Sequence, residues 1–246
     1  MIDLHAHVLP GVDDGPASLE AAVAMVGAAK ADGTTLMVAT PHQRHASWRN
    51  EDRSRLEQAL EELRAAAGPN APQLELGAEI SVDSDFLREI DSFADSGLLS
   101  IAGSRYLLLE LSWRPAAEDS RALIHELLIG GWWPIVAHAE RYPWLADDPA
   151  QLVELHELGA QLQITAMSLT GGFGRKAQSC AEFMLDHGVA DLVASDAHDQ
   201  TERPPLLSEA QRVIASRWGE TRAARLFNEN PYLVIDNRPL RGNSPR

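Results

Sequence analysis

Short apolar runs alternate with longer amphipathic segments along most of this chain. The amphipathic segments carry apolar residues at helical spacing, and the first two end just before Gly33 and Gly68. They predict helices at residues 17–31, 51–67, 118–130, 149–158, 175–187, 205–218 and 220–228. The apolar runs predict strands at residues 2–4, 35–40, 73–79, 105–111, 134–140, 160–165 and 190–195.

Strand and helix alternate with short connections, which is typical of parallel strands joined by crossover helices. The strands are almost entirely apolar, as expected when helices cover both faces of a sheet. The pattern predicts an α/β fold, and a closed barrel and an open doubly wound sheet are both compatible with it. No linker, repeat or low-complexity segment divides the chain, and the polar stretch from Asn237 is expected to be a loose tail.

Imidazole and carboxylate side chains mark the ends of six predicted strands. In parallel α/β folds the carboxyl ends of the strands lie on one face, where active sites form. Successive strand residues point to opposite faces, so His5 and His7 share one direction, as do Asp196 and His198. We therefore expect one cluster made of His5, His7, His42, Glu79, Glu110, His138, Asp196 and His198, with Asp13 or Asp14 from the loop after the first strand.

Such a cluster predicts metal binding, because many buried charges in one cleft are unfavourable without a cation. Imidazole combined with carboxylate suits Zn²⁺, Mn²⁺ or Fe²⁺. The ligands are too many for one tetrahedral site and favour two or three metals with a bridging carboxylate. Each short motif is weak alone, since an H-x-H pair also occurs in ordinary strands and Glu110 could be a buried salt-bridge partner. The prediction depends on all of these residues falling at strand ends on one face.

Composition narrows the class of protein. The chain has 246 residues, of which 45% are hydrophobic, enough for a buried core. Its formal net charge of −15 argues against broad nucleic-acid binding, which needs a basic surface. No segment has the ~20 apolar residues of a membrane helix, and no secretory signal is recognisable. A single cysteine fits a reducing cytosol, so we expect a cytoplasmic protein without membrane insertion.

Six motifs, in this order, carry a resemblance to a known family. They are HAHVLPGVDDG at residues 5–15, ATPH at 39–42, GAE at 77–79, LLLEL at 107–111, IVAHAERY at 135–142 and SDAHDQTERPP at 195–205. The sequence resembles the PHP (polymerase and histidinol phosphatase) superfamily, and within it the manganese-dependent bacterial protein-tyrosine phosphatases of capsule and exopolysaccharide loci. The resemblance implies a distorted seven-stranded (β/α) barrel of the PHP type. It also implies a single PHP catalytic domain at residues 1–236, followed by a flexible tail at 237–246.

The resemblance further implies a centre of three divalent metals, with manganese expected first and iron, zinc or cobalt as alternatives. Transferred motif by motif, one metal is held by His5, His7, Glu79 and Asp196. Glu79 bridges to a second metal, which is completed by Glu110 and His138. The third metal is held by Asp14, His42 and His198. The residues alone do not choose between Asp13 and Asp14, and the resemblance selects Asp14.

The resemblance places Arg141 and Arg203 beside the substrate, where a guanidinium matches phosphate oxygens bidentately. Either arginine could instead pair with a nearby carboxylate, such as Glu140 or Asp199. His42, if it is not fully committed to metal, could assist proton transfer, so we count it among the catalytic candidates with the two arginines.

The implied reaction is hydrolysis of a phosphomonoester by a hydroxide that bridges two metals, since coordination lowers the pKa of water from ~15.7 towards ~7. The expected substrate is the phosphotyrosine tail of a bacterial tyrosine autokinase of capsular or exopolysaccharide biosynthesis. Trp48 and Trp113 follow strands on the same side, where they could stack on a tyrosyl ring or pack a loop or subunit contact. Cysteine catalysis is not expected, because Asp186 stands where the C-x5-R motif after Cys180 needs arginine.

Other functions compete with this one. A histidinol-phosphate phosphatase, or another small-molecule phosphatase, would use the same metal centre. A nuclease-type PHP module is disfavoured by the acidic composition, and a non-catalytic scaffold by the complete ligand set. The sequence does not indicate an oligomeric state.

Overall fold

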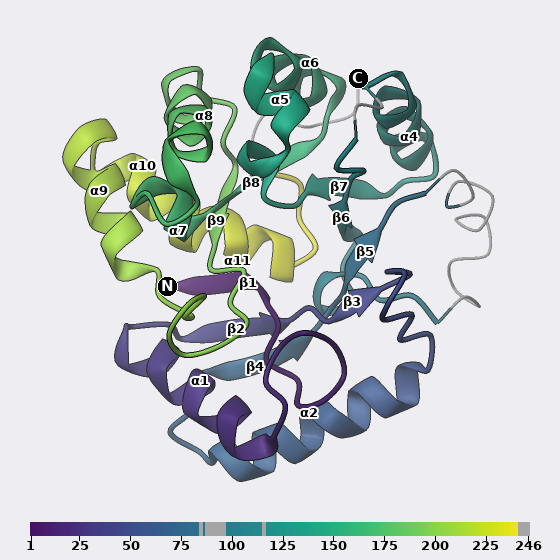
Figure 1. Cartoon of the computed structure of the whole chain (residues 1–246), viewed down its shortest axis with the longest axis vertical. Coiled ribbons are helices and arrows are strands. Elements are labelled where there is room, and N and C mark those ends of the chain that lie inside the picture. Colours follow the sequence, from purple (N-terminus) through teal and green to yellow (C-terminus); the bar gives the residue numbers. More distant parts are fainter. Residues whose placement is uncertain (84–85, 87–96, 115–116, 241–246) are drawn as a thin grey trace.

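Parallel strands occupy the centre of the molecule, and helices cover them (Figure 1). The structure is a computed structural model, and it describes residues 1–83, 86, 97–114 and 117–240. The fold is mixed α/β, as the alternating pattern predicts. The strands are β1 (Ile2–Ala6), β2 (Leu36–Ala39), β3 (His42–Gln43), β4 (Gln73–Leu76), β5 (Glu79–Ser81), β6 (Tyr106–Glu110), β7 (Trp133–Val136), β8 (Gln161–Thr165) and β9 (Leu192–Ala194).

Helices connect most of these strands. The α-helices are α1 (Leu19–Ala31), α2 (Arg53–Ala67), α4 (Ala117–Ile129), α5 (Pro143–Asp147), α6 (Ala150–Leu158), α7 (Ala166–Leu169), α8 (Gly174–Asp186), α9 (Ser208–Trp218), α10 (Glu220–Ala224) and α11 (Asn230–Ile235). Shorter turns form the 3-10 helices η2 (Ile101–Gly103) and η3 (Ala139–Arg141) and the π-helical η4 (Arg225–Glu229). No helix within the described ranges is long and apolar enough to cross a membrane.

The strands form two parallel sheets that meet at both sides. One sheet has the order β1-β2-β4, and the other has the order β3-β5-β6-β7-β8-β9. The chain passes directly from β2 in the first sheet into β3 in the second, and likewise from β4 into β5. Where it crosses, the Gly77 amide after β4 donates to the Ala39 carbonyl at the end of β2 at 2.9 Å. On the other side, a bridge between Ala6 and Ala197 joins the end of β1 to the segment after β9. The parallel sheet is therefore curled, and the carboxyl ends of its strands surround a common centre.

Apolar side chains cover both faces of the strands. On β6, Leu107 and Leu109 pack in one apolar cluster, whereas Tyr106 and Leu108 pack in a second. Burying each such side chain contributes roughly 1.5–3 kcal/mol. Where both faces of a strand are buried, most of its positions are apolar, which explains why several strands consist of nearly continuous apolar runs.

The strand predicted at residues 73–79 is interrupted at Gly77. A Cβ at Gly77 would lie 3.0 Å from Ile101 Cδ1 and 3.1 Å from Val38 Cγ1, so a larger residue would have to displace a neighbour. The interruption moves the chain from one sheet to the other, and Glu79 begins β5 there.

The strand predicted at residues 134–140 is too long. β7 ends at Val136, and His138 adopts a left-handed conformation with φ of 35°, which no β-strand contains. η3 follows at once. The apolar pattern could not predict where the strand ends, because it reflects which residues are buried and not the backbone conformation.

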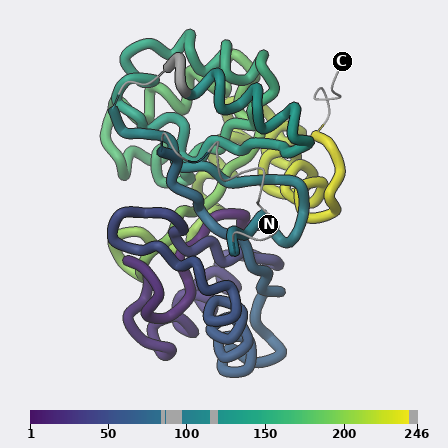
Figure 2. Tube along the Cα trace, turned by 90° about the vertical axis from the view of Figure 1, so that its right-hand side faces the viewer, coloured from purple at the N-terminus to yellow at the C-terminus, as the bar shows by residue number. Residues whose placement is uncertain are grey.

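The last helix, α11, begins beside the amino-terminal end of β9, where Asn230 Nδ2 donates to the Asp191 carbonyl at 2.7 Å. In Figure 2 the first third of the chain, purple to blue, lies at one end, and the teal and green segments lie at the other. The helix predicted at residues 220–228 continues through η4 and α11 to Ile235. Pro231 stands in the first turn of α11, directly after the π-helical η4, and it has no amide hydrogen to donate.

The first residues of the predicted tail contact β6. The Tyr106 hydroxyl donates to the Arg238 carbonyl at 2.9 Å and accepts from the Leu240 amide at 3.1 Å, and the Leu240 side chain is buried. Residues 237–240 are thus attached to the body of the protein, and 241–246 lie outside the described residues.

Candidate metal centre

The nine predicted ligands meet at the carboxyl ends of the strands. Seven of them line a cavity of about 160 Å³, while His5 and His7 lie fully buried behind it. The other side chains that line this cavity are His45, Trp48, Trp113, Arg141 and Arg203. Three larger hollows on the described surface, of about 710, 490 and 760 Å³, contain arginine and glutamate but no histidine. The candidate chemistry is therefore concentrated in one cleft.

The ligands form three groups in which the ligand atoms lie within 4.8 Å of one another. Within the described residues these groups are His7, Asp14, His42 and His198; His5, His7 and Asp196; and His42, Glu79 and Glu110. The resemblance groups Glu110 with His138, whereas the structure brings Glu110 together with His42.

The group of His5, His7 and Asp196 forms where β1 and β9 end. His5 Nε2 and His7 Nε2 lie 3.3 Å apart, and they are 3.4 and 3.7 Å from Asp196 Oδ1. Alternation along the extended chain turns both rings to the same side, as predicted. Asp196 has a φ of 52°, which is costly for a residue other than glycine, and its amide donates to the His5 carbonyl at 2.8 Å. The adjoining strand thus holds the strained backbone that turns this carboxylate toward the histidines.

Glu79 is the central carboxylate of the cleft. Its Oε1 lies 2.7 Å from His138 Nε2, and its Oε2 lies 3.1 Å from His42 Nδ1 and 3.4 Å from His7 Nε2. Its side chain is only 1% exposed. A buried carboxylate whose two oxygens face different imidazoles is suited to bridge two metals.

The structure separates the roles of the two neighbouring aspartates. Asp14 Oδ1 lies 3.3 Å from His198 Nε2 and 3.5 Å from His42 Nε2. Asp13 instead accepts a hydrogen bond from His7 Nδ1 at 2.8 Å and from the His42 amide at 3.1 Å. Asp14 therefore faces the cluster, while Asp13 fixes the orientation of a candidate ligand from behind.

Gln163 is a second supporting residue, and sequence reasoning missed it. Its Oε1 accepts hydrogen bonds from His5 Nδ1 at 2.9 Å and from the His138 amide at 3.1 Å. With Nδ1 donating, the Nε2 atom of His5 keeps its lone pair for the centre. The available signal was a polar residue inside the fully buried strand β8.

The two arginines predicted beside the substrate point into the same cleft. Arg141 Nη1 and Arg203 Nη2 each lie 2.5 Å from Asp196 Oδ2. The alternative carboxylates are engaged elsewhere, because Glu140 accepts from Ser168 Oγ and the Thr165 amide. Asp199 accepts amides of its own loop, including those of Thr201 and Glu202.

Aromatic side chains stand on either side of the opening. Trp48 stacks on His42 with an interplanar angle of 9°, and His45, which sequence reasoning did not single out, stacks on both rings. Across the cleft, Trp113 is 44% exposed, stacks on His138, and donates its indole N–H to Glu110 Oε1 at 3.0 Å. Both tryptophans are thus attached to candidate ligands at the mouth.

Burial and neighbouring charges shift the pKa values of the clustered groups in opposite directions. Burial alone lowers the pKa of His7, but the carboxylates of Asp13 and Glu79 outweigh it and raise that pKa well above its usual value. Burial alone raises the pKa of Glu79, but His5 and other nearby imidazoles hold that pKa well below its usual range. The pKa of Asp196 is also lowered, since His5 and Arg203 outweigh burial. Positive charge among these carboxylates is strongly favoured, whether it comes from protons or from a cation.

Cys180 is not part of the cleft. It is buried in α8, and burial raises the pKa of its thiol to about 12. A thiol with so high a pKa is a poor nucleophile at neutral pH. The structure therefore agrees with the prediction that cysteine catalysis plays no part.

Comparison with known proteins identifies the family. The family model described as capsular polysaccharide synthesis, CpsB/CapC, matches residues 1–236. This chain belongs to the CpsB/CapC family. The family match confirms the resemblance to phosphatases of capsule loci that the six motifs indicated.

Relatives in the CpsB/CapC family match over nearly the whole chain. CapC of Staphylococcus aureus is 36% identical over 249 residues, which cover 100% of this chain and 95% of that protein. The tyrosine-protein phosphatase CpsB of Streptococcus pneumoniae is 31% identical over 242 residues, covering 96% of this chain and 98% of that protein.

A solved structure of the CpsB/CapC family shares the fold. It comes from a study of YwqE from Bacillus subtilis and CpsB from Streptococcus pneumoniae, described as metal-dependent tyrosine phosphatases. It matches with a TM-score of 0.89 at 30% identity, and the match covers 97% of this chain and 95% of that chain. The curled parallel sheet is therefore the fold of a metal-dependent phosphatase family.

Proposed function

We propose that this member of the CpsB/CapC family is a metal-dependent protein-tyrosine phosphatase. The observation that carries the proposal is the convergence of five imidazoles, four carboxylates and two guanidinium groups on one small cleft. The named activities of its relatives support the same reaction. The substrate we propose is the phosphotyrosine tail of a bacterial tyrosine autokinase that acts in capsular or exopolysaccharide biosynthesis.

The donor set of the cleft fits divalent metal ions. His138 Nδ1 is buried and has no hydrogen-bond partner within the described residues, and His42 Nδ1 faces Glu79 at 3.1 Å without hydrogen-bond geometry. Buried polar atoms seldom stay unpaired in native proteins, so they indicate a missing ligand. We assign three divalent ions per chain, manganese first and iron, zinc or cobalt as alternatives, to His5, His7, Asp14, His42, Glu79, Glu110, His138, Asp196 and His198. When bound, such ions polarise phosphoryl oxygens and increase the acidity of water.

Arg141 and Arg203 bind the phosphate group in this proposal. Each guanidinium contacts Asp196 through one terminal nitrogen, and the buried Nε of Arg203 has no partner in the described part of the chain. Two planar guanidinium groups on one side of the cleft match the non-bridging oxygens of a phosphate and balance their negative charge. His42 lines the same cavity and assists proton transfer there if it is not fully committed to metal. Phenolate has a pKa of about 10, so it leaves without a strong general acid.

Trp48 and Trp113 complete the site by flanking the tyrosyl ring. Both line the cavity, and both are held by stacking on imidazoles below them. Aromatic walls on two sides of an opening favour a flat aryl group over an aliphatic phosphate.

The proposal includes the finer architecture implied by the resemblance. If β2 with β3, and β4 with β5, count as single interrupted strands, seven strands follow one another around the centre and the Ala6–Ala197 bridge joins the last to the first. This supports a distorted seven-stranded barrel forming one catalytic domain at residues 1–236. We propose a cytoplasmic location, where the expected kinase tail and a reduced Cys180 would both be found.

Activity and metal content, measured together, test the proposed function. Elemental analysis of the purified protein is paired with hydrolysis of a phosphotyrosine peptide and of histidinol phosphate, before and after chelation. We expect chelation to lower phosphotyrosine turnover by at least about 100-fold and Mn²⁺ to restore it. Turnover that survives complete metal removal would contradict metal dependence. A higher kcat/KM for histidinol phosphate would replace the proposed substrate with a small molecule.

A further inference from the structure

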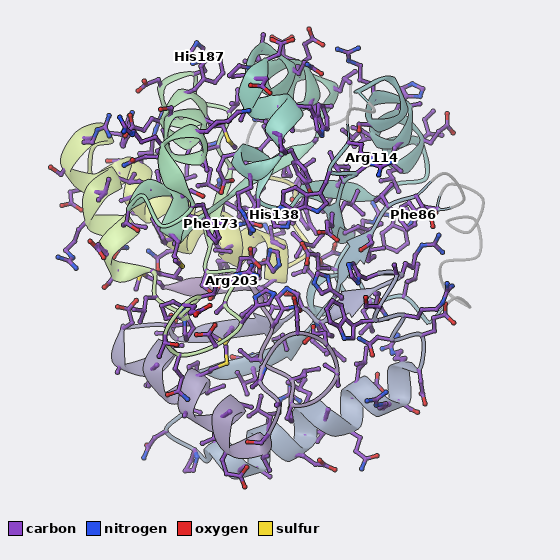
Figure 3. All side chains as sticks on the ribbon, viewed as in Figure 1. Phe86, Arg114, His138, Phe173, His187 and Arg203 are labelled. Atoms are coloured by element: carbon purple, nitrogen blue, oxygen red, sulfur yellow. The ribbon has the colours of Figure 1, made fainter. Side chains whose placement is uncertain are left out.

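An aromatic ring lies against both proposed phosphate-binding arginines. The Cζ atom of Arg141 is 4.0 Å from the centroid of the Phe173 ring, and that of Arg203 is 5.9 Å from the same centroid. Figure 3 shows Phe173 and Arg203 close to His138 at the centre of the molecule. Phe173 comes from the loop between α7 and α8 and was not singled out by any sequence motif. A single residue thus contacts the two cations from outside the metal cluster.

The contact leaves the polar edges of the guanidinium groups available. A guanidinium that stacks on a ring through its flat face keeps its N–H donors pointing outward in the plane of the group. Asp196 Oδ2 engages one nitrogen of each arginine at 2.5 Å. Trp113 lies on Arg141 as well, with its ring centroid 5.7 Å from Cζ. The arginines are therefore held by one carboxylate and by ring faces, and their remaining N–H groups are left for an anion.

The loop that carries Phe173 is shaped by glycines. Gly171 and Gly174 have φ of +86° and +81°, a region that residues with a side chain rarely adopt. A Cβ at Gly172 would lie 2.7 Å from the Met167 Cε atom, so the loop also packs tightly on α7. The Gly172 amide donates to the Met167 carbonyl at 2.8 Å. The glycines allow this backbone path, and the hydrogen bond and the close packing between Gly172 and Met167 hold the loop that carries the half-buried Phe173 beside the cleft.

We propose that Phe173 is a positioning residue that orients Arg141 and Arg203 for phosphate. It acts through the arginines and does not itself touch the reacting atoms. This inference rests on the proposed function insofar as the anion is the phosphate of a phosphomonoester. Its consequence is specific: loss of the ring weakens phosphate binding, while the metal centre behind Asp196 keeps its composition.

The test compares Phe173→Leu with the ring-preserving Phe173→Tyr in metal-loaded protein. A cation–π contact contributes about 0.5–2 kcal/mol, which corresponds to roughly 2- to 30-fold in binding. For Phe173→Leu we expect KM for a phosphotyrosine peptide and Ki for inorganic phosphate to rise about 5- to 10-fold, with kcat changed by less than about 2-fold. Phe173→Tyr should restore both constants to within about 2-fold of the wild-type values. Phe183→Leu, in the same helix-loop region but stacked on His187 away from the cleft, is the matched control and should leave them unchanged.

Metal content and unfolding temperature separate this role from a structural one. The proposal predicts that both stay at wild-type values in Phe173→Leu. Phosphate affinity unchanged in Phe173→Leu, or equally poor in Phe173→Tyr, would overturn it. If Phe173→Leu does not fold, Phe173→Met, with a similar volume and no ring, is judged by the same criteria.

Calorimetric titration of inorganic phosphate into the metal-loaded protein keeps the two proposals apart. If the wild-type protein hydrolyses phosphotyrosine but Phe173→Leu binds phosphate normally, the proposed function stands and the positioning role falls. If the wild-type protein has no such activity but Phe173→Leu binds phosphate more weakly, the positioning role stands and the proposed function falls.

Discussion

The imidazole side and the arginine side of the cleft are built in different ways. The imidazoles and Glu79 come from strand ends, lie almost fully buried, and are fixed from behind by Asp13 and Gln163. Arg141 and Arg203 come from η3 and from the loop after β9, and their side chains are 17% and 26% exposed. They are held by Asp196 and by the faces of aromatic rings. The buried side is suited to retain ions permanently, and the more exposed side is suited to exchange an anion with solvent.

Asp196 belongs to both sides, so its loss should have the largest effect. Asp196→Ala removes a candidate ligand next to His5 and His7 and also the carboxylate that holds both arginines. We expect kcat/KM for a phosphotyrosine peptide to fall about 10³-fold, together with a loss of bound metal. The measurements are steady-state kinetics, elemental analysis and circular dichroism to verify the fold. Asp147→Asn, which removes only a surface pair with Lys176, is the control. A folded Asp196→Ala protein with normal turnover and metal content would refute the assignment.

Arg141→Ala tests the arginine side alone. We expect kcat/KM to fall about 10²-fold, because an anion-stabilising donor is lost, while metal content stays unchanged. The same assay and elemental analysis decide the outcome. Arg121→Ala is a suitable control, since Arg121 pairs with Glu154 on the surface. Loss of metal in Arg141→Ala would show that the two sides are not independent, and unaltered kinetics would remove Arg141 from the site.

The pH dependence of protein stability should also distinguish the imidazole side of the cleft from the arginine side. His5 and His7 have raised pKa values, because neighbouring carboxylates outweigh burial, whereas burial and the charge of His7 lower the pKa of His198. A raised pKa contributes stability below the unfolded value of about 6.5, and this contribution is lost as pH rises through the folded value. Metal ligands must be deprotonated, so metal binding follows the opposite trend.

We therefore expect the unfolding temperature of metal-stripped protein to fall by a few degrees between about pH 6 and pH 9, since two imidazoles have raised pKa values, that of His7 well above the usual value, and only His198 opposes them. The increase in unfolding temperature caused by Mn²⁺ should grow over the same range. Calorimetry on the wild-type protein and on Arg141→Ala measures this, and both should show the same trend because a guanidinium does not titrate there. A stripped protein that becomes more stable with rising pH would contradict the charge assignment.

The strand-end ligands could be predicted because alternation and parallel topology determine where such side chains point. His5, His7 and Asp196 were found in this way, and the structure places their ligand atoms within 3.7 Å of one another. His138 reaches the centre for another reason, a left-handed turn after β7, so its convergence was predicted but its backbone was not. The choice of Asp14 over Asp13 came only from the family resemblance.

The partners of Gln163 and Phe173 could not be predicted from the sequence. In β8, Gln163 is one of three polar residues that alternate with Leu162 and Ile164, so the pattern gives a shared face but no partner. Phe173 is one aromatic residue inside a glycine-rich loop. Each acquires a role only through partners that lie tens of residues away, such as His5 and Arg203. The break at Gly77 was missed for the same reason, since it depends on the approach of Ile101.

The bridge between Ala6 and Ala197 determines when the cleft can form during protein synthesis. The amide of His7 donates to the Ala197 carbonyl, and the amide of Asp196 donates to the His5 carbonyl. The first strand of the chain, β1, therefore obtains these hydrogen-bond partners only when a segment almost two hundred residues later has been made. A nascent or truncated product that ends before this segment lacks one wall of the cleft. Such a product also lacks Asp196, His198 and Arg203, which line the cleft.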